Sequence, residues 1–226
     1  MAYPDLAGKR ILLTQADVFM GPVLEDTLKH SGAEVLSSAA TLVEPDAARE
    51  LIEQSGELDV LVINLGVPAP STAADKADDV EWRQMFDHMV DPLQRLVRSV
   101  LPGMIERQRG KILLMGSASA LRGMKRASSY SAARGAQLAY IRAVGVEVAK
   151  HNIQVNAIAQ NFVDNPTYFP AEIQQNPAFQ ERVKREVPLG RLVSAEEDAM
   201  FAAYLCSDAA NCFVGQVFPV CGGWAD

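Results

Sequence analysis

A serine, a tyrosine and an arginine in segment 117–134 have spacings that suit acid–base chemistry. Tyr130 follows Ser117 by thirteen positions, and Arg134 follows Tyr130 by four. In a helix, Tyr130 and Arg134 share one face. A guanidinium beside a phenol lowers the tyrosine pKa, and a serine hydroxyl alongside can donate to the same substrate oxygen. These residues are candidates for a general base with its orienting partners. In isolation a tyrosine and an arginine at this spacing more often pair on a solvated helix face.

Strand-like and helix-like segments alternate along the chain, and they position these residues. A strand at 111–115 precedes Ser117, and a helix at 129–150 carries Tyr130 and Arg134. Nearly continuous apolar strands between helices indicate a parallel sheet covered on both faces. We therefore predict one α/β domain over residues 1–226, a doubly wound (Rossmann-like) parallel sheet. The further expected strands are 9–14, 34–37, 58–64, 153–158 and 215–220, the further helices 21–31, 47–55, 78–106 and 194–207, with loops and small helices over 160–187.

Composition excludes several classes of function. The 226 residues carry a net charge of −7, which argues against nucleic-acid and anionic-membrane partners. The three cysteines lack metal-ligand spacing and are typical of reduced thiols. The N-terminal residues show no apolar signal region, and no apolar run reaches the length of a membrane span. We expect a cytoplasmic protein without a metal site.

The Ser117, Tyr130 and Arg134 set resembles that of the short-chain dehydrogenase/reductase superfamily, which has Ser and then Tyr-x-x-x-Lys. Arginine in place of lysine resembles one branch, the halohydrin dehalogenases, which share the fold and have no nicotinamide cofactor. The resemblance extends over almost the whole chain, including segments 187–191 and 215–224. Met89 occupies the position at which many dehydrogenases have a catalytic asparagine.

The turn after the first strand distinguishes the branch from its parent. Dinucleotide folds need glycines there, so that the backbone can approach a pyrophosphate. Residues 14–21 read Thr-Gln-Ala-Asp-Val-Phe-Met-Gly, so Gln15 and Phe19 take two of the superfamily's three glycine positions. No acidic residue or arginine for a ribose or its phosphate follows the second strand at Ser37 and Ser38. The sequence therefore predicts that no nicotinamide cofactor binds.

A second turn also differs from the dehydrogenase pattern by carrying larger side chains. Where they have Pro-Gly after the strand at 153–158, this chain has Gln-Asn-Phe-Val at 160–163. Backbone N–H groups in a turn can bind a small anion, and aromatic residues can form its apolar wall. Each aromatic residue taken alone is more often core packing. The resemblance implies a halide and substrate pocket formed by Phe19, Gln160, Asn161, Phe162, Val163 and Phe169, with Tyr168 nearby.

The resemblance implies an enzyme, a carbon–halide lyase without a cofactor. It would convert vicinal haloalcohols into epoxide, halide and proton, and would open epoxides with azide, cyanide or nitrite. Its partners would be the haloalcohol or epoxide and a halide anion. Helices 78–106 and 129–150 resemble those that build a four-helix bundle between subunits, which implies a homotetramer. One alternative is a divergent NAD(P)-dependent short-chain reductase. The other is a non-catalytic interaction module, which has no need of the Ser117, Tyr130 and Arg134 set.

Overall fold

Continuous apolar runs form the strands at the centre of the molecule. Val60–Asn64 (β3) and Gly110–Ser117 (β4) are buried along their whole lengths, as expected for parallel strands covered on both faces. The computed structural model describes residues 4–225. Its other strands are Arg10–Thr14 (β1), Glu34–Ser38 (β2), Ile153–Gln160 (β5) and Val217–Val220 (β6).

All neighbouring strands pair in parallel, in the order β2-β1-β3-β4-β5-β6. The chain order reverses between β1 and β3, where loops from adjacent strands separate and leave a crevice at the carboxyl edge of the sheet. The predicted α/β class and doubly wound parallel sheet are confirmed. β4 and β5 each run two residues beyond their predicted ends, to Ser117 and Gln160, which pair with each other.

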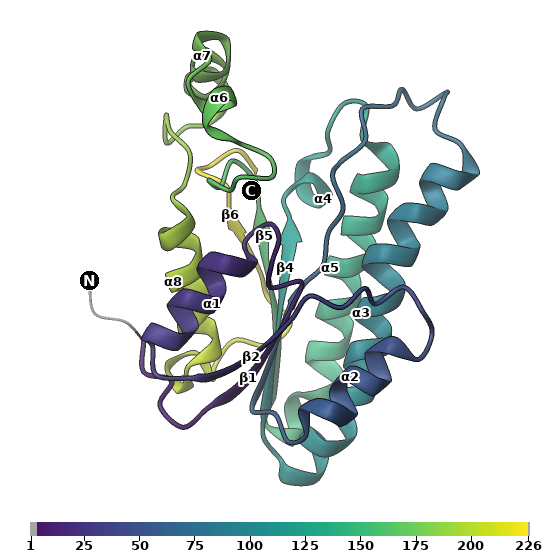
Figure 1. Cartoon of the computed structure of the whole chain (residues 1–226), viewed down its shortest axis with the longest axis vertical. Helices are drawn as coiled ribbons and strands as arrows, with labels where there is room; N and C mark the ends of the chain where they lie inside the picture. The colour runs from purple at the N-terminus through teal and green to yellow at the C-terminus, as the bar shows by residue number, and fades with distance from the viewer. Residues whose placement is uncertain (1–3, 226) are drawn as a thin grey trace.

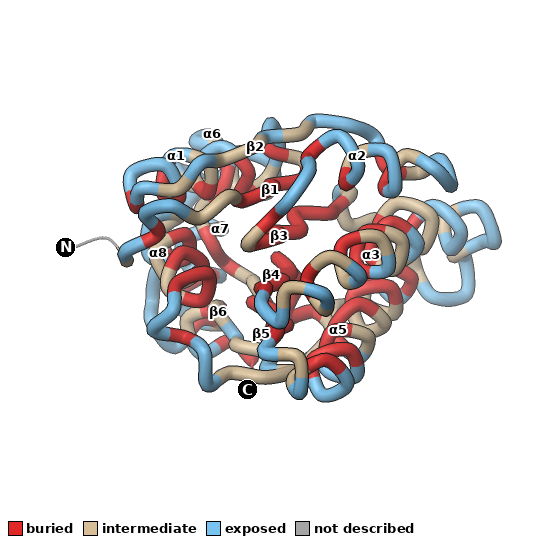
Figure 2. The backbone as a smooth tube through the Cα atoms, turned by 90° about the horizontal axis from the view of Figure 1, so that it is seen from below, coloured by how far each residue is buried: buried red, intermediate tan, exposed pale blue. Residues whose placement is uncertain are grey.

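Helices cover both faces of the sheet (Figure 1). Viewed from the end, α1 and α8 lie on one side of the buried strands and α2, α3 and α5 lie on the other (Figure 2). The helices are Gly21–His30 (α1), Ala47–Ser55 (α2), Asp79–Arg107 (α3), Ser119–Arg122 (α4), Ser128–Val148 (α5), Ala171–Gln174 (α6), Pro177–Glu186 (α7) and Ala195–Cys206 (α8), with 3₁₀ turns at Ala149–His151 (η1) and Asp208–Ala210 (η2).

Two apolar cores lie on the two faces of the sheet. Leu24 and Leu28 of α1 belong to one core, and Leu96 of α3 and Leu138 of α5 belong to the other. Burying one such aliphatic side chain contributes about 1.5–3 kcal/mol relative to leaving it exposed. The two cores therefore fix the sheet rigidly beneath the loops that follow its strands.

Side-chain caps set the starts of two helices. Asp78 accepts a hydrogen bond from the Glu81 amide at 2.9 Å and caps the first turn of α3. The helix therefore begins next to the predicted start at residue 78. Ser194 and Glu197 form a reciprocal capping box at the start of α8. Within residues 4–225, no helix has both the length and the apolar content needed to cross a membrane.

Candidate active site

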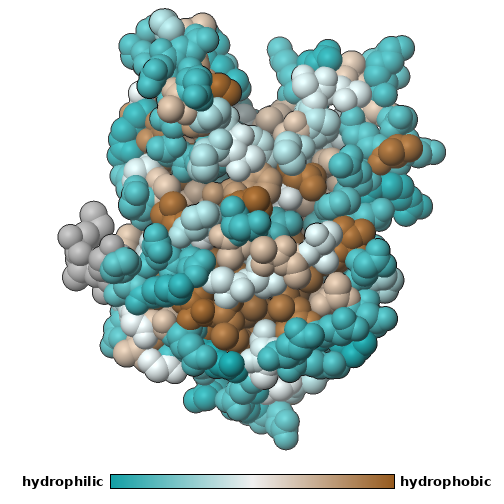
Figure 3. All heavy atoms as spheres, in the orientation of Figure 1, coloured by the Kyte–Doolittle hydropathy of each residue, from teal (hydrophilic) through white to brown (hydrophobic). Residues whose placement is uncertain are grey.

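A cavity of about 410 Å³ opens at the carboxyl edge of the sheet. The molecule is visibly hollowed at this edge, between the α6–α7 region and the loop tips opposite (Figure 3). Ligands in open α/β sheets bind at this kind of crevice. The structure brings all the predicted site residues to this one cavity: Phe19, Ser117, Tyr130, Arg134, Gln160, Asn161, Phe162, Val163 and Phe169.

Helix α5 places Tyr130 and Arg134 together at the bottom of the cavity. Both are buried, and the guanidinium carbon of Arg134 lies 5.1 Å from the centre of the Tyr130 ring. Burial acts to raise the pKa of Tyr130. The charge of Arg134 and hydrogen bonding from Tyr168, Arg134 and Ser117 outweigh it, so the pKa lies below its ordinary value. The phenol is thus prepared to lose its proton.

Arg134 is held by neutral acceptors. Its Nη1 donates to the carbonyl oxygens of Leu65 at 2.8 Å and Met115 at 3.3 Å, and to Oε1 of Gln137 at 3.0 Å. Within residues 4–225 no carboxylate pairs with it, and its Nε has no hydrogen-bond partner. A buried cation without a carboxylate stabilises a nearby anion strongly, and the Tyr130 ring lies against this one.

Ser117 ends β4 beside these two residues. Its Oγ lies 2.9 Å from the Oγ of Ser119 and accepts a hydrogen bond from the Ser119 amide at 3.2 Å. The side chain of Ser117 is buried and its position is therefore fixed by the strand and by Ser119. A hydroxyl placed in this way can donate to a substrate oxygen that also contacts Tyr130.

Tyr168 contributes a hydroxyl that the sequence did not assign to the chemistry. Its oxygen lies 3.1 Å from the carbonyl oxygen of Val67 and 3.4 Å from the Tyr130 oxygen, so its one hydrogen can bond to either acceptor. Burial and the charge of Tyr130 raise the pKa of Tyr168 far above its ordinary range, so its proton is retained. Tyr168 can therefore turn its proton from the Val67 carbonyl oxygen to Tyr130 when Tyr130 is ionised.

The turn after β1 keeps a glycine-type backbone while carrying side chains. Gln15 and Phe19 have φ of 44° and 52°, in the left-handed region that glycine adopts without strain. A Cβ on the retained Gly21 would lie 2.5 Å from the backbone of Ala16, so glycine is required there. Asn64 holds the turn by donating from Nδ2 to the carbonyl oxygen of Gln15 at 2.8 Å. The Asn64 hydrogen bond and the close packing of Gly21 therefore hold the turn in this conformation despite the strain at Gln15 and Phe19.

The Phe19 ring lies over the end of β3, next to the catalytic candidates. A Cβ added to Gly66 would lie 3.3 Å from Cε2 of Phe19 and 2.8 Å from Nη2 of Arg134. Because Gly66 has no side chain, the Phe19 ring and the Arg134 guanidinium can both approach its Cα. Phe19 also contacts the ring of Tyr168, with centroids 5.6 Å apart.

In the turn after β5, one backbone amide is already hydrogen-bonded to a neighbouring side chain. The Phe162 N–H donates to Oδ1 of Asn161 at 2.9 Å, which occupies a donor that the sequence had assigned to a halide. On either side of Val163, the Asp164 amide donates to the Val193 carbonyl oxygen and the Val193 amide donates to the Phe162 carbonyl oxygen, at 2.9 Å each. Within residues 4–225 the Val163 amide itself donates no hydrogen bond. Phe162 has φ of 50° and is a third non-glycine residue in the left-handed region beside the cavity.

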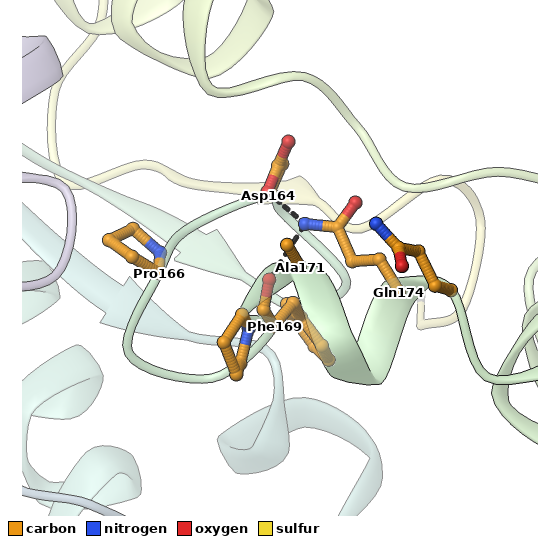
Figure 4. Close-up of a pocket in the computed structure, with 7 residues that line it drawn as sticks. Asp164, Pro166, Phe169, Ala171 and Gln174 are labelled. Atoms are coloured by element: carbon orange, nitrogen blue, oxygen red, sulfur yellow. Dashed lines mark hydrogen bonds between the residues drawn. The ribbon is translucent and has the colours of Figure 1, made fainter.

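Aromatic packing forms one wall of the cavity. The rings of Phe162 and Phe169 stack with centroids 6.0 Å apart, and Phe162 also contacts Trp224. A shallow hollow of about 360 Å³ lies beside this wall. There, Gln174 of α6 donates to Oδ1 of Asp164 and to the carbonyl oxygen of Phe169, at 2.7 Å each (Figure 4). These bonds fix the segment that carries Phe169.

A buried carboxyl group lies beneath the last residue of β5. Nε2 of Gln160 donates to Oδ2 of Asp198 at 2.5 Å, and Oδ1 of Asp198 has no hydrogen-bond partner within residues 4–225. Asp198 is fully buried, which raises its pKa to about 7, although the Gln160 hydrogen bond acts to lower it. The sequence did not single out Asp198, because an acid after Glu196 and Glu197 suits an exposed first turn.

Comparisons with known proteins find reductases among the relatives by sequence, and both reductases and dehalogenases among the similar solved structures. The family described as Enoyl-(Acyl carrier protein) reductase matches residues 28–225. An uncharacterized oxidoreductase of Bacillus subtilis (strain 168) is 34% identical, over 85% of this chain and 77% of that protein. The 3-oxoacyl-[acyl-carrier-protein] reductase of Escherichia coli (strain K12) is 26% identical, over 97% of this chain and 98% of that protein.

Two solved structures similar to this chain are dehalogenases. A structure described as a dehalogenation enzyme is 29% identical with a TM-score of 0.87, covering 97% of this chain and 99% of that one. A halohydrin dehalogenase bound to ethyl (2S)-oxiran-2-ylacetate is 26% identical with a TM-score of 0.84, covering 96% and 97%. The sheet, the cavity at its carboxyl edge and the family match over residues 28–225 together identify this chain as a member of the Enoyl-(Acyl carrier protein) reductase family, within the short-chain dehydrogenase/reductase superfamily.

Proposed function

We propose that this chain is a halohydrin dehalogenase, a carbon–halide lyase that works without a nicotinamide cofactor. The observation that carries the proposal is the position of Phe19, whose ring lies over Gly66 and beside Arg134. In a dinucleotide-binding relative this region is kept free of side chains for the cofactor. Here an acid–base set remains while the adjoining space is filled, which suits chemistry without hydride transfer.

The residues present do not fit a nicotinamide dinucleotide. Gln15 and Phe19 add side chains where a pyrophosphate needs bare backbone, and Gln15 Oε1 accepts the Gly66 amide at 3.0 Å. Ser37 and Ser38 at the end of β2 offer no carboxylate or guanidinium to a ribose or its phosphate.

In the proposed reaction, Ser117 and Tyr130 hold the hydroxyl of a vicinal haloalcohol, and the Tyr130 phenolate accepts its proton. The substrate oxygen attacks the neighbouring carbon from the side opposite the halogen. A C–O bond forms as the carbon–halogen bond breaks, and its electron pair leaves with the halide. The products are an epoxide, a halide ion and a proton that Tyr130 returns to solvent. Arg134 suits this role because a guanidinium keeps its charge at any working pH.

The departing halide needs a donor and an apolar wall. The Val163 amide is the candidate donor in the turn 160–163, since the Phe162 amide is bound to Asn161. Stacked Phe162 and Phe169 supply apolar surface beside it. Such a site selects small, weakly hydrated anions rather than one halogen, so azide, cyanide and nitrite should open epoxides in the reverse reaction.

Bromide release from 2-bromoethanol without any nicotinamide tests the proposal, with ion chromatography as the readout. We expect release by the wild-type protein and loss of about a hundred- to ten-thousand-fold of it in Tyr130→Phe. Equal release by the wild type and Tyr130→Phe would contradict it. A bromide-soaked crystal adds a second readout, in which we expect the anomalous peak beside residues 160–163.

A divergent NAD(P)-dependent short-chain reductase is the second candidate, because the family match and the two curated relatives above are oxidoreductases. Titration with NADH and NADPH separates the two. A micromolar dissociation constant, about −8 kcal/mol of binding free energy, would favour the reductase.

We also propose that α3 and α5 form the contacts of a homotetramer. Both helices expose apolar side chains: Val80 and Trp82 at or near the start of α3, and Val146 on α5, which is 73% exposed. These side chains lie on the two helices that resemble the subunit-contact helices, which supports the proposal. Light scattering of the purified protein measures its mass against the 24.5 kDa chain.

A further inference from the structure

The cavity carries positive charge that the proposed ring closure does not use. Arg134, Lys125 and Arg182 line it, and no aspartate or glutamate does so within the described residues. This contrasts with the protein as a whole, which has a net charge of −7. The local excess of cations is therefore a property of the cavity and not of the general surface.

Lys125 and Arg182 come from different elements of the fold. Lys125 lies in the loop between α4 and α5, is exposed, and forms no ion pair or hydrogen bond within residues 4–225. Arg182 of α7 places its guanidinium carbon 5.5 Å from the centre of the Phe162 ring. Its Nε forms an ion pair with Oε2 of Glu186 at 3.1 Å, so the two Nη groups are the ones that can bind a ligand. Stacking on Phe162 fixes the guanidinium at the cavity while half of the side chain stays in solvent.

These two cations are not needed for the halide. The candidate halide donor, the Val163 amide, belongs to a buried residue. Lys125 is exposed, and Arg182 lies against the Phe162 ring with half of its side chain in solvent. A neutral haloalcohol of two or three carbons also gains nothing from them. The cavity volume of about 410 Å³ lies within the range that holds drug-sized ligands, so a larger substrate fits.

We propose that the substrate is a haloalcohol or epoxide that carries a carboxylate, which Lys125 and Arg182 bind at the mouth while its reacting end lies at Tyr130. This inference rests on the proposed dehalogenase function. A carboxylate accepts hydrogen bonds from a guanidinium in bidentate geometry, and a free ammonium adds a second charge contact. The cavity thus selects a small organic acid over its neutral analogue.

The test compares two substrates that differ in charge and little in shape: 4-bromo-3-hydroxybutanoate and 4-bromo-3-hydroxybutanamide. Bromide release gives kcat/KM for each. We expect the acid to exceed the amide by about tenfold, and Lys125→Gln and Arg182→Gln each to lower this ratio about two- to fivefold, the range of partly exposed ion pairs. Lys184→Gln removes a charge from the same helix, α7, at a residue that does not line the cavity, and should keep the wild-type ratio.

The outcomes separate the two proposals. Release from the amide without preference for the acid, or an unchanged ratio in the Lys125→Gln, Arg182→Gln double variant, overturns the carboxylate site and leaves the dehalogenase standing. If neither compound releases bromide, the dehalogenase fails, and calorimetric titration with halogen-free 3-hydroxybutanoate and 3-hydroxybutanamide decides the carboxylate site by itself. Tighter binding of the acid that is lost in the double variant supports the site, and equal binding of the two compounds overturns it.

Discussion

Replacing Asp198 with asparagine removes a buried ionisable group and keeps its size. Burial raises the Asp198 pKa from its ordinary 3.8 to about 7 in the folded protein. The folded state therefore binds this proton more tightly than the unfolded state does. The resulting stabilisation is fully present below about pH 4, falls as the pH rises towards 7, and is lost above it. The difference of about three pKa units corresponds to about 4 kcal/mol.

Asparagine stays neutral and can still accept the Gln160 hydrogen bond through its Oδ1. We therefore expect the free energy of unfolding of Asp198→Asn, relative to the wild type, to rise by about 3 kcal/mol between pH 5 and pH 8. Urea unfolding curves at four pH values across this range measure the difference directly.

Glu197→Gln is the matched control on the same turn of α8. The Arg191 side chain and the Ser194 amide lower the pKa of Glu197 to about 2, so its contribution is lost only as the pH falls below 5. Its effect should stay constant between pH 5 and pH 8. If the free energy of unfolding of Asp198→Asn relative to the wild type were the same at pH 5 and pH 8, the reasoning would be refuted. The carboxyl group of Asp198 would then be ionised in the folded protein over this whole range.

Three further predictions concern the site. Arg134→Lys should move the rise of activity to higher pH, because the base must be deprotonated and a less pre-organised cation lowers the Tyr130 pKa less; a pH–rate profile unchanged from wild type would contradict this. Gln15→Gly with Phe19→Gly should weaken bromide inhibition by admitting water to the cavity, and steady-state inhibition at several bromide concentrations measures it. Gly66→Ala should lower activity because its Cβ would lie 2.8 Å from Arg134 Nη2, and unaltered kcat would show that the guanidinium can move aside.

Apolar continuity in the sequence was sufficient to predict the sheet and the helices beside it. The signal weakens where strands end in polar or small residues, which is why the predicted strands stop before Gly116 and Ser117 of β4 and before Ala159 and Gln160 of β5. Helix α4 is four residues long and too short for a 3.6-residue period to be recognised.

The chain's motif spacing was sufficient to predict which residues meet at the cavity, but not how their polar atoms pair. The bond from the Phe162 amide to Asn161 depends on a side-chain rotamer, which sequence pattern does not specify. Gln137, which accepts from Arg134 and donates to the Met89 carbonyl oxygen at 2.7 Å, had a detectable signal: it lies three residues after Arg134 on the same helix face. Asp198 had none, because burial of an acid is a tertiary event.

Gln15, Phe19 and Phe162 adopt left-handed backbone conformations, which are the conformations that glycine adopts most easily. This has a consequence for how the site of this fold can change by substitution. Each of these side chains costs about 1 kcal/mol of strain, while the main chain keeps the path that a glycine turn follows. Filling or emptying the cofactor space therefore requires point substitutions and no rebuilding of loops. A strain of this size is small against the stability of about 5–15 kcal/mol that is typical of a domain. The proposed dehalogenase chemistry would thus be reachable from a dinucleotide-binding relative through single substitutions at these turns.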